Sequence, residues 1–431
     1  MAVIGPLIDW WSMADLRSII TSTIGLTDCA DLSARVAELK ETAGLRRCFH
    51  FFENSKKWID EQHLSICRVP ALTFRERARA QFISEIWRDL GLRPSLDEAG
   101  NLVAPIVYSR DLPFVAVSAH LDTILAPRSD ADIRVGPDGT FYGPGVTDNG
   151  VGLAGLTALA RALQGGPLVV APRRNILLVA NVAEEGEGNL QGMKYLCLHS
   201  PFAPSISEYL VIDGSSLSHI TSEALGSRRF ELIIEGYGGH SWNDFGMANP
   251  VHAISRACSL LSDIELPTSP PATLTVAMIE GGTGVNSIAT GARAKVDIRS
   301  RSAEAIDLVV GRMEAALKQA VDVENRRATQ RRLTAFRIRE IGHRPAAPAT
   351  AENPLVDCIQ AVDSNLRIRS RVDCASTDAN VPLAAGYPAV AIGAGGRGGD
   401  PHAPTEWYRS EGRALGLQRI ALTLALLQTS V

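Results

Sequence analysis

Three apolar stretches of this chain end in acidic or histidine residues, and this pattern narrows the folds open to it. The stretches cover residues 114–117, 175–183 and 209–212. They lead, in chain order, to His120 and Asp122, to Glu184 and Glu185, and to Asp213. Continuous apolar strands are typical of mostly parallel sheets that helices cover on both faces. The carboxyl ends of such strands are where α/β proteins place their binding sites. We therefore expect an α/β fold with a mostly parallel sheet and a polar site at one edge.

Length and composition restrict the class of protein further. The 431 residues exceed one ordinary core, so we expect two domains. A net charge of -4 lacks the basic excess of a nucleic-acid surface. No apolar run is long enough to span a bilayer, so no membrane partner is expected. The start of the chain carries Asp9 and Asp15 and no basic segment, which does not resemble a signal peptide. Seven scattered cysteines without a CxxC pair indicate reduced thiols and a cytoplasmic location.

The order of apolar patterns predicts how the domains are arranged. Residues 1–68 read as extra N-terminal helices, and residues 73–92 as an amphipathic helix that Thr73 and Glu76 start with a capping box. From residue 224 the pattern changes to strand, helix, two strands, helix and strand, as in a ferredoxin-like unit. We therefore predict an inserted α+β domain at 224–344, and a metal-binding catalytic domain formed by 1–223 and 345–431.

Two further residues extend the polar site. A Gly143-Pro144-Gly145 turn leads to Asp148, and a Gly-rich loop leads to His402. Imidazoles and carboxylates without thiolates suit Zn²⁺, with Mn²⁺ or Co²⁺ as alternatives. Two metal ions need several carboxylates, one of them bridging, and at least two histidines, and one acid must stay free to accept a proton. The adjacent Glu184 and Glu185 can divide these tasks, because neighbouring side chains diverge.

Five motifs resemble those of the M20 metallopeptidase family, the di-zinc exopeptidases and deacylases related to peptidase T, carboxypeptidase G and acetylornithine deacetylase. The motifs are SAHLDT (118–123), GPGVTDNGVGLAG (143–155), EEGEGNLQG (184–192), VIDG (211–214) and PHAPTEW (401–407). The segment STDANVPLAAGYPAV (376–390) is most similar to the peptidase T-like branch. The resemblance covers about residues 70–431, and residues 1–68 have no counterpart in it.

The resemblance implies a role for each residue of the site. Asp148 bridges two metal ions, His120 and Asp213 complete the ligands of one, and Glu185 and His402 complete those of the other. Glu184 is implied as the general base. Asp122 is implied to orient His120 rather than to bind metal.

The resemblance also assigns residues of the inserted domain, which in the family usually dimerises. His240, in GGHSW, is implied to reach the partner subunit's site and stabilise an oxyanion. Asn286 and Arg299 are implied to hold the substrate, and a guanidinium can grip a carboxylate with two hydrogen bonds. His240 following two glycines also fits a turn, and Arg299 alternating with Lys295 and Asp297 also fits a solvated strand face.

These inferences predict a homodimeric metallohydrolase that cuts an amide bond in a short peptide at its N-terminal side. The same centre would serve an N-acyl-amino-acid deacylase, because the fold and metals fix the reaction while the pocket fixes the substrate. A non-catalytic binding relative is a third reading, but such a protein is expected to have lost a ligand or Glu184. A monomeric aminopeptidase of a related clan would lack the segment 224–344.

Overall fold

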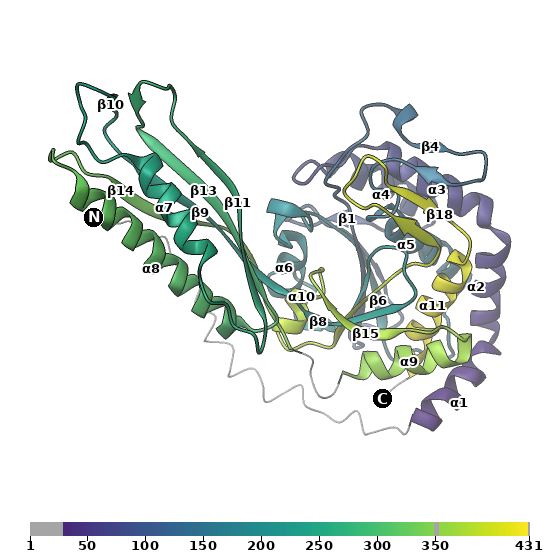
Figure 1. Cartoon of the computed structure of the whole chain (residues 1–431). Helices are drawn as coiled ribbons and strands as arrows, with labels where there is room; N and C mark the ends of the chain where they lie inside the picture. Colours follow the sequence, from purple (N-terminus) through teal and green to yellow (C-terminus); the bar gives the residue numbers. More distant parts are fainter. Residues whose placement is uncertain (1–28, 349–352, 430–431) are drawn as a thin grey trace.

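The computed structural model describes residues 29–348 and 353–429, and they form two bodies, each built on its own sheet (Figure 1). The larger body is built on an eight-stranded sheet of order β1-β2-β6-β3-β7-β16-β8-β15. Its strands are β1 (Ser95–Leu96), β2 (Leu102–Ile106), β3 (Phe114–His120), β6 (Asn175–Asn181), β7 (Ile206–Ile212), β8 (His219–Ala224), β15 (Arg371–Ala375) and β16 (Ala389–Ile392). The pairs of β3 with β6 and β7, of β7 with β16, and of β8 with β15 are parallel, whereas β2 pairs antiparallel to its neighbours. The predicted mostly parallel α/β sheet is confirmed.

Both faces of this sheet are buried, and alternate residues of one strand show it. Val115 and Val117 of β3 belong to one apolar core, and Phe114 and Ala116 belong to another. The first core is covered by α1 (Cys29–Lys40), α2 (Ala43–Asn54), α3 (Lys56–Arg68), α4 (Arg77–Asp89), α5 (Gly150–Leu163), α9 (Pro354–Leu366) and α11 (Arg413–Thr429). The second core is covered by α6 (Gln191–Leu198) and α10 (Asn380–Ala384). Helices on both faces explain why the strand sequences are apolar without alternation.

The smaller body is a four-stranded antiparallel sheet of order β11-β13-β9-β14 with its own apolar core. In chain order it contains β9 (Gly226–Glu235), α7 (Pro250–Ser262), β11 (Ala272–Gly281), β13 (Gly291–Ser300), α8 (Ala303–Arg327) and β14 (Ala335–Arg344). Both helices lie on the same side of the sheet (Figure 1). A two-stranded ribbon of β10 (Gly239–His240) and β12 (Ser287–Ile288) stands at the end of this sheet far from the larger body (Figure 1).

A third, small sheet joins two segments of the larger body that are far apart in the sequence. Its order is β17-β18-β5-β4, formed by β4 (Arg134–Val135), β5 (Phe141–Tyr142), β17 (Arg397–Gly399) and β18 (Trp407–Arg409). Short 3₁₀ turns, η2 (Asp130–Asp132), η3 (Gly186–Gly188) and η4 (Ala203–Ser205), lie in the connections. Because β5 precedes Asp148 and β17 and β18 flank His402, this sheet brings the two loops that carry them side by side.

The start of α4 differs from the prediction. The helix begins at Arg77, and its N-cap residue is Glu76, not Thr73. Glu76 accepts the main-chain N–H of Phe74, and the Thr73 hydroxyl donates to Asp122 at 2.9 Å. The predicted capping box is therefore wrong, because a buried carboxylate elsewhere in the chain takes the Thr73 hydroxyl. Among the described helices, none combines the length and apolar character that a bilayer crossing requires.

Candidate metal centre

His120 is the last residue of β3, and the register of the sheet fixes its position along the strand. It pairs with Asn181, the last residue of β6, and the next amide, that of Leu121, donates to the Asn181 carbonyl. The His120 side chain is buried. Its Nδ1 lies 3.0 Å from the main-chain oxygen of Asp122 and 3.5 Å from its carboxylate. A proton on Nδ1 satisfies this contact and leaves the lone pair on Nε2, the tautomer that a metal ligand needs.

Asp148 is presented by a turn whose amides are held by a distant carboxylate. Glu406 accepts the main-chain N–H groups of Gly145, Thr147 and Asp148 at 2.7–2.9 Å. Gly145 has a φ of +76°, a left-handed conformation that favours glycine at the bend. Glu406 therefore shapes the turn that aims the Asp148 side chain.

Asn149 connects this turn to the loop that carries Asp213. It caps α5 by accepting the Gly152 N–H at 3.1 Å. The same side chain donates to the Ile212 carbonyl at 2.8 Å and accepts the Gly214 N–H at 3.2 Å. Since Ile212 and Gly214 flank Asp213, one amide side chain sets the distance between the Asp148 and Asp213 loops.

The loop after β6 carries Glu184 and Glu185, and side chains from other elements hold its amides. The Asp122 carboxylate accepts the N–H groups of Glu184 and Glu185 at 3.0 and 2.9 Å. Glu76 accepts that of Ala183 at 3.0 Å, and Asn101 that of Val182 at 3.0 Å. Asp122 thus does more than the predicted orientation of His120, because it also positions both glutamates.

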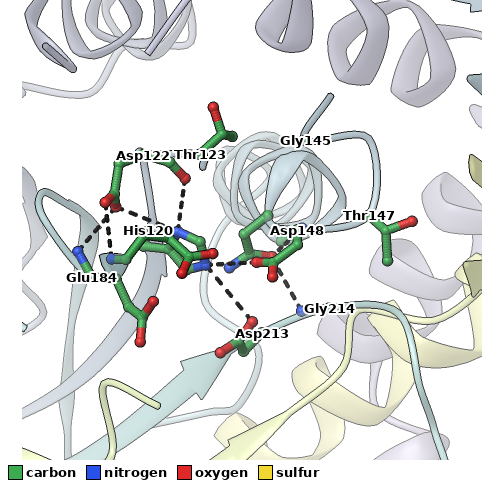
Figure 2. Close-up of polar contacts among 12 residues, drawn as sticks. His120, Asp122, Thr123, Gly145, Thr147, Asp148, Glu184, Asp213 and Gly214 are labelled. Carbon is green, nitrogen blue, oxygen red and sulfur yellow. Dashed lines mark hydrogen bonds and ion pairs between the residues drawn. The ribbon is translucent and has the colours of Figure 1, made fainter. Parts of the chain in front are cut away.

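The structure brings the other four predicted ligands together around Asp148. Its Oδ1 lies 2.9 Å from His120 Nε2, which is 3.8 Å from Asp213 Oδ1. Its other oxygen, Oδ2, lies 3.1 Å from His402 Nε2, which is 2.7 Å from Glu185 Oε1. Figure 2 shows the His120 ring next to Asp148 and Asp213. The two oxygens of Asp148 therefore face two separate groups of donors, as a bridging carboxylate requires.

Geometry and charge both fit divalent metal ions. Donor atoms of His120, Asp148 and Asp213 lie within 4.8 Å of one another, and so do those of Asp148, Glu185 and His402. Hydrogen bonds with Asp148 and Glu185 raise the pKa of His402 to about 10. Burial lowers the pKa of His120, but Asp122, Asp148 and Asp213 together raise that pKa well above its ordinary value. The carboxylates thus favour positive charge at this place, and divalent cations would supply it.

Glu184 lies beside this cluster and differs from the ligands in its partners. Its carboxylate is buried and takes part in a third possible donor group with His120 and Glu185. Burial raises the pKa of Glu184 well above its ordinary value, although Arg344 opposes this shift. Arg344, at the end of β14, donates to Glu184 Oε1 at 3.0 Å. A buried carboxyl group with a raised pKa is suited to proton transfer.

The three site residues predicted in the segment 224–344 do not join the cluster. His240 lies in β10, at the far end of the smaller sheet (Figure 1). Its side chain is exposed, and Nδ1 accepts the N–H of Trp242 at 3.2 Å. Asn286 is exposed next to β12, and its main-chain oxygen accepts the Ser241 N–H. Arg299 donates to Asp297 at 2.6 Å on the face of β13.

Several residues that support the centre were not predicted from the sequence. They are Thr73, Glu76, Asn101, Asn149, Arg344 and Glu406. Glu406 and Asn149 lie within the quoted motifs, so their closeness in sequence to His402 and Asp148 could have indicated a role at the site. Arg344 and Thr73 are distant in sequence from every ligand, and only the fold places them there.

Comparison with known proteins agrees with this geometry. Residues 116–426 match the sequence model of peptidase family M20/M25/M40. A search of curated protein sequences gave no match.

Solved structures show the same fold at low sequence identity. Aminopeptidase PepT from Bacillus cereus is 17% identical, with a TM-score of 0.66 over 86% of this chain and 98% of that one. A tripeptidase from Staphylococcus aureus is 20% identical, with a TM-score of 0.65 over the same shares, 86% and 98%. The YXEP protein of Bacillus subtilis, described as a dinuclear metal binding peptidase, is 14% identical, with a TM-score of 0.63 over 89% and 99%.

The family match covers more than half of the chain, and the fold of the solved structures extends over nearly all of it. The chain therefore belongs to peptidase family M20/M25/M40, a family of hydrolases that act on peptide bonds.

Proposed function

We propose that this chain is a metallo-exopeptidase that hydrolyses an amide bond in short peptides with two divalent ions. His120 and Asp213 would hold one ion, Glu185 and His402 the other, and Asp148 both. The carboxylate and imidazole donors favour Zn²⁺, with Mn²⁺ or Co²⁺ as alternatives. The observation that carries the proposal is the division of the Asp148 oxygens between two donor groups, next to a buried glutamate that belongs to neither of them.

The bound ions would polarise the amide carbonyl and make the attacking water more acidic. Glu184 accepts one proton of that water as the water oxygen attacks the carbonyl carbon. It then donates the proton to the amide nitrogen while the carbon–nitrogen bond breaks, so that a carboxylic acid and an amine leave. Asp122 keeps Glu184 in place through the main-chain amide, and it keeps the His120 ring oriented.

The smaller body has a proposed role in the same reaction. We propose that residues 224–344 form an inserted domain through which the chain dimerises, and that 1–223 and 345–431 form the catalytic domain. The strand β10, which carries His240, lies at the end of the smaller sheet far from the larger body (Figure 1), and this supports a contribution of His240 to the site of the second subunit. There it would donate to the oxyanion, while Asn286 and Arg299 would bind the substrate's carboxylate or backbone.

The substrate we favour is a dipeptide or tripeptide with a free amino terminus, cut on its N-terminal side. The similar aminopeptidase and tripeptidase structures support this choice. An N-acyl-amino-acid deacylase is the alternative outcome, because the same centre would cleave that amide. Six cysteines between Cys48 and Cys374 are free thiols, which supports the cytoplasm as the compartment.

A hydrolysis screen with metal analysis tests the proposal. Purified protein should contain about two divalent ions per chain and lose activity when a chelator removes them. Di- and tripeptides with free amines are then compared with N-acyl amino acids at equal concentration. Faster release of an N-terminal amino acid supports the exopeptidase, and faster cleavage of the N-acyl series replaces it with the deacylase. Full activity in metal-stripped protein, or a binding-competent protein without hydrolysis, overturns the proposal.

A further inference from the structure

Arg344 joins the smaller sheet to the residue that we propose as general base. It is the last residue of β14, and its side chain and that of Glu184 are each 6% exposed. Nη1 donates to Glu184 Oε1 at 3.0 Å, and Nη2 donates to the main-chain oxygen of Glu184 at 2.5 Å. One planar guanidinium therefore holds the same residue by its side chain and its backbone.

This arrangement fixes the Glu184 carboxylate in one orientation. The backbone on the amide side is held by Asp122, and the carbonyl side is held by Arg344. Ser376 supports the guanidinium by accepting from Nη1 at 3.2 Å. With Oε1 engaged, the second oxygen, Oε2, has no hydrogen bond from the part of the chain that the structure describes. A carboxylate held by one oxygen presents the other to a reacting water.

We propose that Arg344 is a positioning residue for the hydrolytic reaction, one that orients Glu184 so that Oε2 can exchange a proton with water and leaving amine. The inference rests on the proposed function, because it assumes that Glu184 is the base. Within the described part of the chain, the side-chain hydrogen bonds of Arg344 go to Glu184 and Ser376, and none goes to a proposed metal ligand. Its contribution is to remove the rotamer freedom of a side chain that must stand within hydrogen-bond reach of the water.

A purely structural role for Arg344 is the competing explanation, and neighbouring contacts make it testable. The same loop is attached to the same sheet by Arg229 of β9, which donates to the Gly186 carbonyl at 2.5 Å. Lys295 of β13 pairs with Glu187 at 3.2 Å. Neither contact involves Glu184, so these residues hold the loop without orienting the carboxylate. Arg229→Ala is therefore the matched control for Arg344→Ala.

The experiment measures kcat and KM of wild type, Arg344→Ala, Arg344→Lys and Arg229→Ala. The substrate is a peptide that the wild type cleaves, and every protein carries its full content of metal ions. Arg344→Ala should lower kcat by about 10²-fold, the usual cost of misplacing a reacting group, with KM changed less than about threefold. Arg344→Lys should recover part of kcat, because an ammonium keeps the charge but cannot donate to both oxygens in a fixed plane. Arg229→Ala should keep kcat within about threefold of wild type, since the bond from Arg229 to the Gly186 carbonyl does not involve the Glu184 carboxylate.

A second measurement separates positioning from stability. In a Glu184→Gln background, Arg344→Ala should cause no further loss of the residual rate, whereas its effect on the thermal unfolding midpoint should persist. If Arg344→Ala does not fold, Arg344→Lys carries the test, and its kcat must fall at least about tenfold, because a Lys side chain lacks the fixed two-point donor geometry.

The inference fails if Arg344→Ala and Arg229→Ala lower kcat equally, or if Arg344→Ala changes only KM. It also fails if Arg344→Ala lowers the rate as much in the Glu184→Gln background as in wild type. An inactive wild type overturns the proposed function together with the role of Arg344. An active wild type with normal Arg344 variants overturns the role of Arg344 alone.

Discussion

Single carboxylates at this centre hold several partners at once. Asp122 accepts the hydroxyl of Thr73 and the amides of Glu184 and Glu185, and it contacts Nδ1 of His120. Burial raises the pKa of Asp122, but the contacts with His120 and the two amides lower that pKa overall. A buried carboxylate with this many donors stays ionised and rigid. Replacing one carboxylate oxygen of Asp122 by an amide nitrogen should therefore disturb the positions of His120, Glu184 and Glu185.

Glu184→Gln should remove the proton acceptor while the side chain keeps its size. We expect kcat to fall by about 10²–10⁴-fold with two metal ions still bound, because general base catalysis contributes on that order. Steady-state kinetics and metal analysis of the same sample check this. Glu187→Gln is the control, since Glu187 is exposed in the same loop and, among the described residues, forms its ion pair with Lys295. A Glu184→Gln rate near that of the control would remove Glu184 from the mechanism.

Asp122→Asn should weaken metal binding more than it changes the fold. Loss of the partner of a ligating imidazole commonly lowers metal affinity about 10–100-fold. Competition with a chromogenic chelator measures the affinity. Asp138→Asn serves as the control, because Asp138 also accepts the main-chain N–H of Thr140 but is exposed in the turn between β4 and β5. Equal affinities in the two variants would show that Asp122 does not orient His120.

Among the elements, α3 contacts the turn that carries Asp148 through a buried histidine, His63. His63 Nε2 donates to the Val146 carbonyl at 2.7 Å, two residues before Asp148. Its Nδ1 accepts from Arg413 of α11 at 3.3 Å, and Arg413 is paired with Asp60. Phe141 and Tyr408 pack against the ring edge to face. The ring is thus enclosed by apolar groups and one cation, a setting that disfavours a second positive charge.

Burial lowers the pKa of His63 from 6.5 to about 4, and this predicts a dependence of stability on pH. Between these values the unfolded chain binds a proton that the folded chain does not, so stability falls as pH drops from 6.5 to 4. Protonation of His63 in the unfolded chain should lower the free energy of unfolding by about 2 kcal/mol at pH 5 relative to pH 7. Urea unfolding at the two pH values should show a loss smaller by that amount in His63→Gln than in wild type. The exposed His50→Gln should leave the wild-type loss unchanged, and equal losses in all three proteins would contradict the assignment.

At the scale of the whole molecule, the two bodies meet at the loop between β6 and α6. Arg229, Lys295 and Arg344 of the smaller sheet all contact this loop, which carries Glu184 and Glu185. The opposite end of the same sheet carries His240, with the exposed aromatic residues Tyr237, Trp242 and Phe245 nearby. The smaller sheet therefore contacts its own centre at one end, and the β10–β12 ribbon with His240 lies at the other end (Figure 1).

Mixing two inactive variants tests whether His240 acts across a dimer. His240→Ala subunits lack the proposed oxyanion donor, and Glu184→Gln subunits lack the proposed base. A mixed dimer holds one site with both residues intact, so about a quarter of wild-type activity should return after a 1:1 mixture exchanges subunits, since half of the dimers are mixed and each has one working site of two. Size-exclusion chromatography checks the dimer. No recovery from fully exchanged dimers would place His240 in its own subunit's site, and an active His240→Ala protein would place His240 outside the reaction.

The sequence predicted the strands of the larger sheet correctly where the apolar pattern was continuous. The apolar runs at 114–117, 175–183 and 209–212 became buried strands, and their polar ends met at one sheet edge. Thr73 shows the limit, because its sequence spacing to Glu76 suited a capping box but a buried acceptor took its hydroxyl. The roles of His240, Asn286 and Arg299 stay predictions, since they depend on a second subunit or a substrate.

The sequence by itself determined the mostly parallel sheet and the group of residues at its edge, since strand periodicity and strand ends are local properties. Only the tertiary structure decided how those residues are held. Glu406 lies 258 residues from Asp148, and Arg344 lies 160 residues from Glu184. Hydrogen bonds between residues so far apart in sequence produce no pattern of residue spacing from which they could be predicted. They form because buried amides and charges must find partners, and the fold determines which partners are near.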